Sequence, residues 1–490
     1  MLSSRRTRLA LAGLALAAAG CVGTPGVEGV RGTAPSPSTE WTPPPAPRAA
    51  AAPTAPPHVI PANIAARVDS LSLSDVVDIA LRNNAQTAAT WADARAAAAT
   101  YGAERGSYFP SLTLSGSVTR LKTVQSQGRT GVDQTVYGPT LNLSYLLFDF
   151  GGRTGAVRNA RDALLQADWT HNATIQSVVL QVEIAYFQYF ATKSLLTAQQ
   201  STLAEADTNL KAAQERHDVG LATIADVLQA RTARSQARLA LETTQGQLAS
   251  ARGALALSMG LPANVPYDIE RAPEGPPPLG IMEGVDSLIA RAVRTRPDLS
   301  TARAVVDAAD ARVTQARGAM LPSLSLSANA GRTYVANSSI QGANYTASLG
   351  ISIPLFQGFS RQYQLRAAEA SADAARARAT QLEQRVTYQV FTAYYGLQTA
   401  TQRVRTSDDL LASATQSEEV ALARYREGVG SVLDLLTAQA ALADARAQSI
   451  DARWSWYTAL AQLAHDTGVL GLDGSTPFHF APDSTPPSPQ

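Results

Sequence analysis

The sequence contains few of the residue types on which most enzymes and small secreted domains depend. Its 490 residues include one cysteine and five histidines, which excludes a disulfide scaffold and argues against a histidine- or cysteine-based metal cluster. The net charge is +1, whereas nucleic-acid-binding proteins usually carry a basic surplus. No phosphate-binding loop, dinucleotide-binding glycine pattern or nucleophile–histidine arrangement stands out. We therefore expect no enzyme, no cofactor, no metal site and no nucleic-acid partner.

Long apolar runs are also missing. The chain has no run of 18 or more consecutive apolar residues, so we expect no transmembrane helix. Its one marked apolar run, residues 9–19, follows three arginines and is too short to span a membrane. This arrangement predicts a signal peptide over residues 1–20.

The signal peptide ends in three small residues followed by the single cysteine, Cys21. This pattern resembles a bacterial lipobox, in which the chain is cleaved before the cysteine and the cysteine is acylated. Val22 follows where an aspartate would favour the inner membrane, so the resemblance implies a lipid anchor in the outer membrane. The alternative is an ordinary secretory signal with an incidental cysteine. Residues 21–66 are rich in proline and alanine and predict a tether, and residues 473–490 predict a disordered tail.

The rest of the chain is one unit written twice. Residues 216–230 match residues 424–438 at an offset of 208, and the same offset relates other positions before and after this segment. A constant register over so long a stretch indicates an internal duplication. We place the first repeat at residues 67–270 and the second at residues 281–472, with a joint rich in proline and glycine between them.

Each repeat predicts the same order of elements. A helical stretch, 73–106 in the first copy and 286–318 in the second, precedes two alternating runs that are typical of strands with one apolar face. A helical hairpin follows the strands in each copy. The predicted strands are about 111–121 and 134–148, then 323–335 and 344–356, and the predicted hairpins are 153–258 and 361–467. Strands that face lipid on one side fit these runs, and a soluble sheet with one solvated face is the alternative.

The predicted hairpins are very long. Residues 153–217 contain no proline and would form roughly 100 Å of helix. In the second copy the return helix keeps a heptad seam of mostly small residues from Leu433 to Ala464, the pattern of a coiled coil. Four strands cannot close a barrel, since about eight are needed, and an open sheet edge invites aggregation. We therefore expect several chains to build one barrel together.

At this point the sequence resembles the TolC-like outer-membrane efflux family over roughly residues 70–470. The resemblance rests on the strand starts with Pro-Ser-Leu and on two turn motifs, Arg216-x-x-x-Gly220-x-x-x-x-x-Asp226 and Arg424-Tyr425-x-x-Gly428-x-x-x-x-x-Asp434. It implies a mostly α fold with transmembrane β, in which a homotrimer forms a 12-stranded β-barrel continued by a 12-helix α-barrel. It also implies outer-membrane lipid, a periplasmic adaptor (membrane fusion) protein and an inner-membrane transporter of the resistance-nodulation-division type as partners.

The resemblance also assigns roles to individual residues. It implies a periplasmic gate that includes Asp434, Asp226, Tyr425 and Arg424, with three copies of Asp434 forming an acidic ring. The alternative for the two aspartates is helix capping, because each lies three residues after a hydroxyl residue. The alternative for Tyr425 is packing. The turns are expected to dock onto the adaptor; their residues are Val219, Gly220 and Leu221 in the first copy and Gly428, Val429 and Gly430 in the second.

These inferences together predict an outer-membrane channel-tunnel that extends into the periplasm and gives a tripartite efflux pump a passive exit duct for drugs or other small toxic compounds. Two alternatives stay open. One is the outer-membrane duct of a type I protein secretion system. The other is a lipid-anchored coiled-coil scaffold without a pore.

Overall fold

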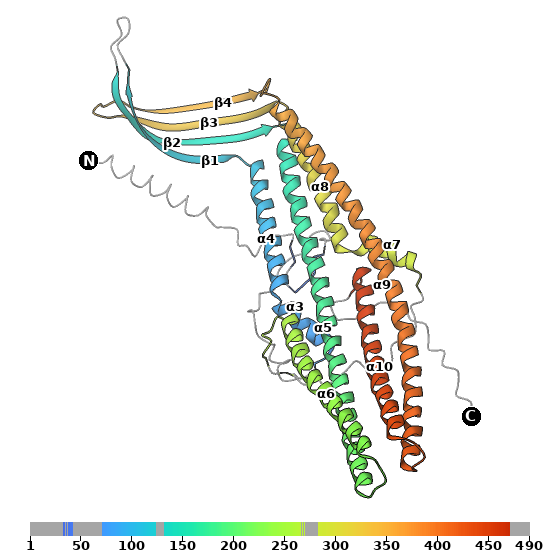
Figure 1. The fold of residues 1–490 in the computed structure, drawn as a ribbon. Coiled ribbons are helices and arrows are strands. Elements are labelled where there is room, and N and C mark those ends of the chain that lie inside the picture. Colours follow the sequence, from blue (N-terminus) through green and yellow to red (C-terminus); the bar gives the residue numbers. More distant parts are fainter. Residues whose placement is uncertain are drawn as a thin grey trace.

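The computed structural model describes residues 33–34, 36, 38–42, 71–123, 132–265, 267, 269 and 283–470. It has a curved four-stranded sheet at one end and long helices that run away from it (Figure 1). The predicted signal peptide, Cys21, the joint between the repeats and the tail at 473–490 lie outside the described residues. The fold class expected from the sequence, mostly helical with a duplicated strand–helix unit, is confirmed.

Apart from one short 3₁₀-helix in the first copy, the two repeats contain the same elements in the same order. The first contains α3 (Leu73–Asn83), α4 (Ala85–Arg105), the short η3 (Gly106–Tyr108), β1 (Ser111–Lys122), β2 (Asp133–Phe148), α5 (Gly152–Asp218) and α6 (Ile224–Ser258). The second contains α7 (Val285–Thr295), α8 (Pro297–Gly318), β3 (Ser323–Val335), β4 (Gln341–Ser352), α9 (Ser360–Arg426) and α10 (Val432–Asp466).

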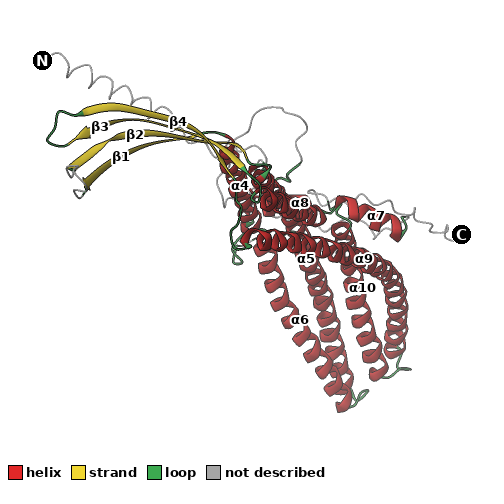
Figure 2. Ribbon diagram, turned by 90° about the horizontal axis from the view of Figure 1, so that it is seen from above, coloured by secondary structure: helices red, strands yellow, loops and turns green. Residues whose placement is uncertain are grey.

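The sheet is antiparallel, with strand order β1-β2-β3-β4, and forms one curved layer (Figure 2). Residues paired across strands point to the same face. One such row crosses all four strands as Leu112, Leu143, Ala328 and Ala347, and a neighbouring row consists of Ser111, Ser144, Ser327 and Ser348. The sheet therefore has one apolar and one hydroxyl-rich face. Apolar side chains such as Leu112 and Leu349 are more than 60% exposed in the single chain.

The boundaries of the last strand differ from those predicted from the sequence. We predicted a strand at 344–356, whereas β4 covers Gln341–Ser352. Pro354 explains the early end, because proline has no N–H to donate to a neighbouring strand. The strand is displaced toward the β3–β4 turn, and Phe356 lies in the segment that leads into α9.

The helical stretch before each strand pair is broken, although the sequence predicted one continuous helix. Asn84 separates α3 from α4, and its side-chain oxygen accepts hydrogen bonds from the amides of Gln86 and Thr87. In the second repeat the break falls at Arg296, before Pro297 at the first position of α8. An asparagine cap and an amino-terminal proline are both strong helix-start signals.

The longest helices are α5 and α9, with 67 residues each, or roughly 100 Å of helix. Each turns back into a helix of 35 residues, α6 or α10. The larger hydrophobic core surrounds the middle of α5 and the second half of α10, with Tyr186 and Trp456 almost fully buried. No helix in the described part of the chain is long and apolar enough to cross a membrane.

Only the second half of the heptad seam predicted on α10 is buried, at residues such as Trp454 and Ala461. Leu433 is 58% exposed, whereas Leu435 and Leu442 are buried. Near the tip the helix packs against α9 through the face that carries these two leucines. The tip half of the predicted seam lines an open groove instead.

Glycines allow close contact where α5 crosses α8 near the sheet. A Cβ atom on Gly155 would lie 2.5 Å from the backbone nitrogen of Gln315 and 2.9 Å from the carbonyl oxygen of Ala311.

Gly155→Ala should therefore lower the free energy of unfolding by about 1–3 kcal/mol. Gly246→Ala in α6 is the matched control, because nothing lies within 4 Å of its added methyl group. Helix propensity should make that change neutral or stabilising by up to about 1 kcal/mol. Denaturant titration of both variants checks the prediction, and equal effects would contradict it.

Candidate functional site: the hairpin tips

The tip of the first hairpin ends in a motif built on one left-handed glycine. Gly220 has φ +79°, its amide donates to the carbonyl of His217, and the amide of Leu221 donates to the carbonyl of Arg216. These two bonds form a Schellman motif, which satisfies the free carbonyls of a helix end. Val219 and Leu221 are 69% and 71% exposed.

The tip of the second hairpin repeats this geometry. Gly428 has φ +77°, its amide donates to the carbonyl of Tyr425, and the amide of Val429 donates to the carbonyl of Arg424. Val429 is 69% exposed. Gly430 cannot easily carry a side chain, because an added Cβ would lie 3.0 Å from the Cβ of Arg424. Each chain therefore presents two equivalent turns with exposed aliphatic side chains at their ends.

The two aspartates of the turn motifs both form capping boxes. The amide of Asp226 donates to the hydroxyl of Thr223, and the amide of Thr223 donates to the Asp226 carboxylate at 2.8 Å. Asp434 exchanges the corresponding bonds with Ser431 at 3.1 and 3.3 Å. Capping thus gives both aspartates a structural role.

Asp434 carries a negative charge at neutral pH. Hydrogen bonds from the side chain and backbone of Ser431 lower the pKa of its carboxyl group, and the nearby charge of Arg424 lowers it further. The carboxylate is exposed at the start of α10. The charge stays exposed to solvent while Asp434 caps the helix.

Ser431→Ala should loosen the first turn of α10 and raise the pKa of Asp434. Loss of a serine cap costs about 1 kcal/mol, so we expect amide hydrogen exchange in this turn to accelerate about fivefold. The control is Thr437→Ala, because the Thr437 hydroxyl donates only to the carbonyl of Leu433 within the same helix. Unchanged exchange in Ser431→Ala would contradict a capping role.

A residue that the sequence reasoning did not assign connects the two tips. The Arg216 guanidinium lies 4.9 Å from the centre of the Tyr425 ring, and its Nη1 donates a 3.0 Å hydrogen bond to the carbonyl oxygen of Tyr425. The Tyr425 side chain is buried, and its hydroxyl has no hydrogen-bond partner in the described part of the chain. Tyr425 therefore contacts the first hairpin through its ring and its backbone. Arg424, the other residue expected in a tip link, is exposed.

Further polar links join the hairpins along their shafts. Asn209 of α5 donates to the side-chain oxygen of Gln439 in α10 at 2.6 Å, and Gln439 donates to Glu418 in α9 at 3.2 Å. Closer to the core, Arg446 forms a 3.0 Å ion pair with Glu205. The α5 residues in these links lie on one face of the helix. The sequence alone does not show which residues of the first repeat contact which residues of the second.

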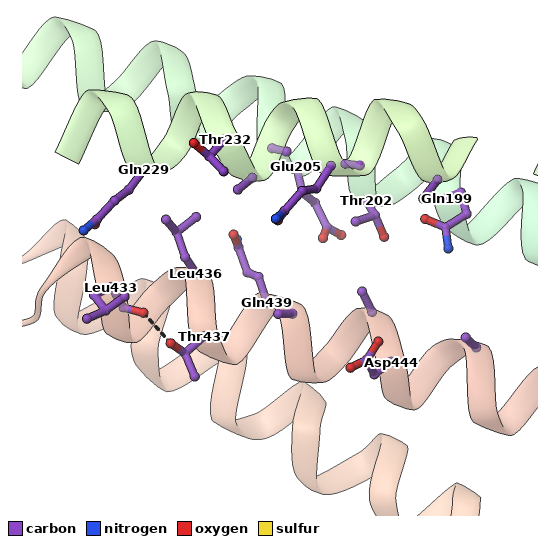
Figure 3. A pocket seen from close by; sticks show the side chains of 18 of the residues that line it. Gln199, Thr202, Glu205, Gln229, Thr232, Leu433, Leu436, Thr437, Gln439 and Asp444 are labelled. Atoms are coloured by element: carbon purple, nitrogen blue, oxygen red, sulfur yellow. Dashed lines mark hydrogen bonds between the residues drawn. The ribbon is translucent and has the colours of Figure 1, made fainter. Parts of the chain in front are cut away.

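A groove of about 760 Å³ lies beside these links, lined by residues of α5, α6 and α10. Figure 3 shows Gln229 and Thr232 on the α6 side, facing Leu433, Leu436 and Gln439 of α10. Alanines from α6 and α10 form much of its wall. The groove separates the two return helices, so the hairpins have room to move relative to each other near their tips.

The tips combine exposed aliphatic turns, capped carboxylates and an arginine contact between the two hairpins. These groups suit binding to another apolar surface and electrostatic attraction of positive charge. Within the described ranges no group of three or more histidine, cysteine, aspartate and glutamate residues could hold a metal ion.

Comparison with known proteins is consistent with this geometry. The family model described as outer membrane efflux protein matches residues 76–261 and 288–469, that is, both repeats. A relative from Bordetella pertussis, protein CyaE, is 31% identical over 84% of this chain and 87% of its own length. The probable efflux pump outer membrane protein TtgC from Pseudomonas putida is 26% identical over 80% of this chain and 82% of its own length.

Solved structures share the fold. A membrane protein from Pseudomonas aeruginosa has a TM-score of 0.74 and 26% identity, covering 81% of this chain and 93% of its own. The CmeC outer membrane channel of Campylobacter jejuni has a TM-score of 0.73 at 20% identity, covering 83% and 88%. With both repeats matched, the chain belongs to the outer membrane efflux protein family.

Proposed function

We propose that this chain is the passive exit duct of a tripartite efflux pump. Three copies would join their sheets into a 12-stranded barrel in the outer membrane and their hairpins into a 12-helix tunnel across the periplasm. The observation that carries the proposal is the sheet. In the described chain β1 and β4 each have an edge without a partner strand, and one face carries exposed apolar residues. Closure with other chains would satisfy the edges, and lipid would cover the apolar face.

The proposed partners are a periplasmic adaptor and an inner-membrane transporter of the resistance-nodulation-division type. The tips support adaptor docking, because the exposed side chains of Val219, Leu221 and Val429 stand at the ends of the hairpins. The duct itself would supply no energy. Its cargo would be drugs or other small toxic compounds that the transporter delivers.

The proposed gate is formed by the tips. Three copies of Asp434 would place negative charge around the entrance and favour cations, in addition to capping α10. Arg216 and Tyr425 would hold the two tips of each chain together in the closed state. The proposal also includes acylation of Cys21, which would anchor the amino terminus in the outer membrane.

Resistance assays with tip variants test the proposed function. Leu221→Asp combined with Val429→Asp should abolish complementation of drug resistance in a strain that lacks the gene, while trimers accumulate in the outer membrane at the normal level. Leu221→Met with Val429→Ile is the matched control and should complement fully. Full resistance with the aspartate pair would contradict docking through the tips. Unchanged drug sensitivity on deletion, with loss of a secreted protein instead, would replace the proposal by the protein-secretion duct.

A further inference from the structure

Part of the segment that we predicted to be a free tether is attached to the helices. Residues 33–34, 36 and 38–42, called the strap below, contact side chains of α4 and α5. Ala34 and Trp41 are only 3% and 5% exposed. The proline- and alanine-rich composition gave no sign of this contact, so the expectation of a free tether over residues 21–66 is wrong for the strap.

Three side chains bind the backbone of the strap. Asn172 accepts a hydrogen bond from the amide of Trp41 at 2.6 Å and donates one to the carbonyl of the same residue at 2.5 Å. The Trp91 indole donates to the carbonyl of Ala34 at 2.8 Å. His171 is within 3.1 Å of the carbonyl of Thr39 through Nε2.

The contacts indicate a specific binding surface for the strap on α4 and α5. Asn172 is 3% exposed and uses both ends of its amide on one residue of the strap, as a neighbouring strand would. His171 is fully buried and contacts Thr90 of α4 through its other ring nitrogen at 3.1 Å. The Trp41 ring meets the Trp169 ring edge-on, with centroids 5.2 Å apart. Side chains from two helices thus converge on one short segment.

The position of this surface limits where a lipid anchor can lie. Asn172 is twenty residues from the start of α5 at the sheet, or roughly 30 Å along the helix. Twelve residues lie between Cys21 and Ala34, and the two Cα atoms can be at most about 45 Å apart. A flexible chain of this length has an average end-to-end distance of only about 20 Å. The extended connection is therefore long enough to reach the sheet end of α5, whereas one much shorter would not be.

We propose that the surface formed by Trp91, His171 and Asn172 is a docking site for the strap of the same chain, and that the docked strap confines the amino-terminal lipid anchor to the bilayer beside its own sheet. The docking does not depend on transport. The confinement rests on the proposed acylation of Cys21. The strap would also hold α4, which leads into β1, against α5.

Proteolysis after Glu40 tests the docking. Glu40 is half-buried within the strap, so a glutamate-specific protease should cut there slowly in the purified full chain. Asn172→Ala should accelerate this cut at least tenfold, while cuts within α5 stay slow. The control is Asn159→Ala on the same helix, where Asn159 donates to the carbonyl of Ala308 and does not contact the strap. Cleavage of Asn172→Ala at the wild-type rate would overturn the docking site.

Shortening the segment between Cys21 and Ala34 tests whether the docked strap confines the lipid anchor. Deletion of residues 22–30 leaves three residues between Cys21 and Ala34, about 14 Å between the two Cα atoms at full extension. In membranes the lipidated deletion variant should then expose the Glu40 bond, and cleavage should accelerate at least tenfold. The same deletion behind a signal peptide without a lipidation site, with Cys21→Ser, should restore slow cleavage. Slow cleavage of the lipidated form, with acylation verified by mass spectrometry, would overturn the confinement but leave the docking site and the exit-duct proposal untouched.

Discussion

Arg216→Ala is expected to make the outer membrane leaky to large hydrophilic antibiotics that are normally excluded. The change removes both the cation–π contact with the Tyr425 ring and the hydrogen bond to its carbonyl. Because Arg216 is only partly buried, we assign the pair of contacts about 1–2 kcal/mol per chain. This energy corresponds to a shift of roughly 5- to 30-fold toward open tips. The inhibitory concentration of vancomycin should fall about eightfold in cells that produce the variant.

Companion variants separate the contacts that hold the tips. Tyr425→Phe should leave the barrier intact, because the Tyr425 hydroxyl has no partner in the described chain, whereas Tyr425→Ala should resemble Arg216→Ala. Arg216→Lys should be intermediate, since lysine keeps the charge but loses the planar fork. Arg231→Ala, an exposed arginine of the same hairpin, controls for loss of charge. A leaky Tyr425→Phe with a tight Arg216→Ala would show that the hydroxyl, and not the arginine, closes the tips.

The second large effect concerns two buried carboxyl groups in α5. Asp168 and Glu183 are 0% and 2% exposed, and both oxygens of Asp168 lack hydrogen-bond partners in the described chain. Desolvation by burial raises the pKa of each to about 8. Both groups therefore keep a proton in the folded protein at neutral pH, whereas in the unfolded chain they lose it near pH 4.

The sign of the pH effect follows from this difference. Between about pH 4 and pH 8 the folded state binds more protons than the unfolded state, so stability falls as pH rises. Each group contributes about 1.4 kcal/mol per pH unit to the slope, and the contribution ends above its folded pKa. Asp168→Asn should remove one of the two contributions, and Asp168→Asn with Glu183→Gln should remove both. Denaturant titration in detergent between pH 5 and pH 9 measures the slope.

The matched control for this series is Asp93→Asn, which changes an exposed aspartate of α4. It should leave the slope at its wild-type value. If the double variant kept the wild-type slope as well, the two carboxyl groups would have to be ionised in the folded protein, and the assignment of their protons would be wrong.

Much of the fold could be predicted because its signals are local or repeated. The duplication located both hairpins and both glycine turns, and the hydroxyl residues before Asp226 and Asp434 predicted their capping boxes. Alternation identified the strands. The end of β4 was missed because the alternating pattern continues through Pro354, where the missing N–H breaks the ladder.

The contacts between distant segments could not be predicted. Arg216 and Tyr425 are 209 residues apart, and their meeting depends on how two hairpins pack. The strap was missed for a related reason. Its binding comes from hydrogen bonds between Asn172 and the backbone of Trp41, and backbone groups leave no mark on composition. The α10 seam was a correct pattern whose core half packs within the chain, at Trp454, Ala461 and Ala464, whereas its tip half lines the groove.

The most direct test of the exit-duct account is the conductance of the purified full chain in planar lipid bilayers. The account predicts that trimers form pores with a small, cation-preferring conductance while the tips are closed, and that Arg216→Ala raises the conductance several-fold. Asp434→Asn should weaken the cation preference. Trimers that insert into the bilayer but carry no current, in both the wild-type chain and Arg216→Ala, would contradict the account and favour a scaffold without a pore.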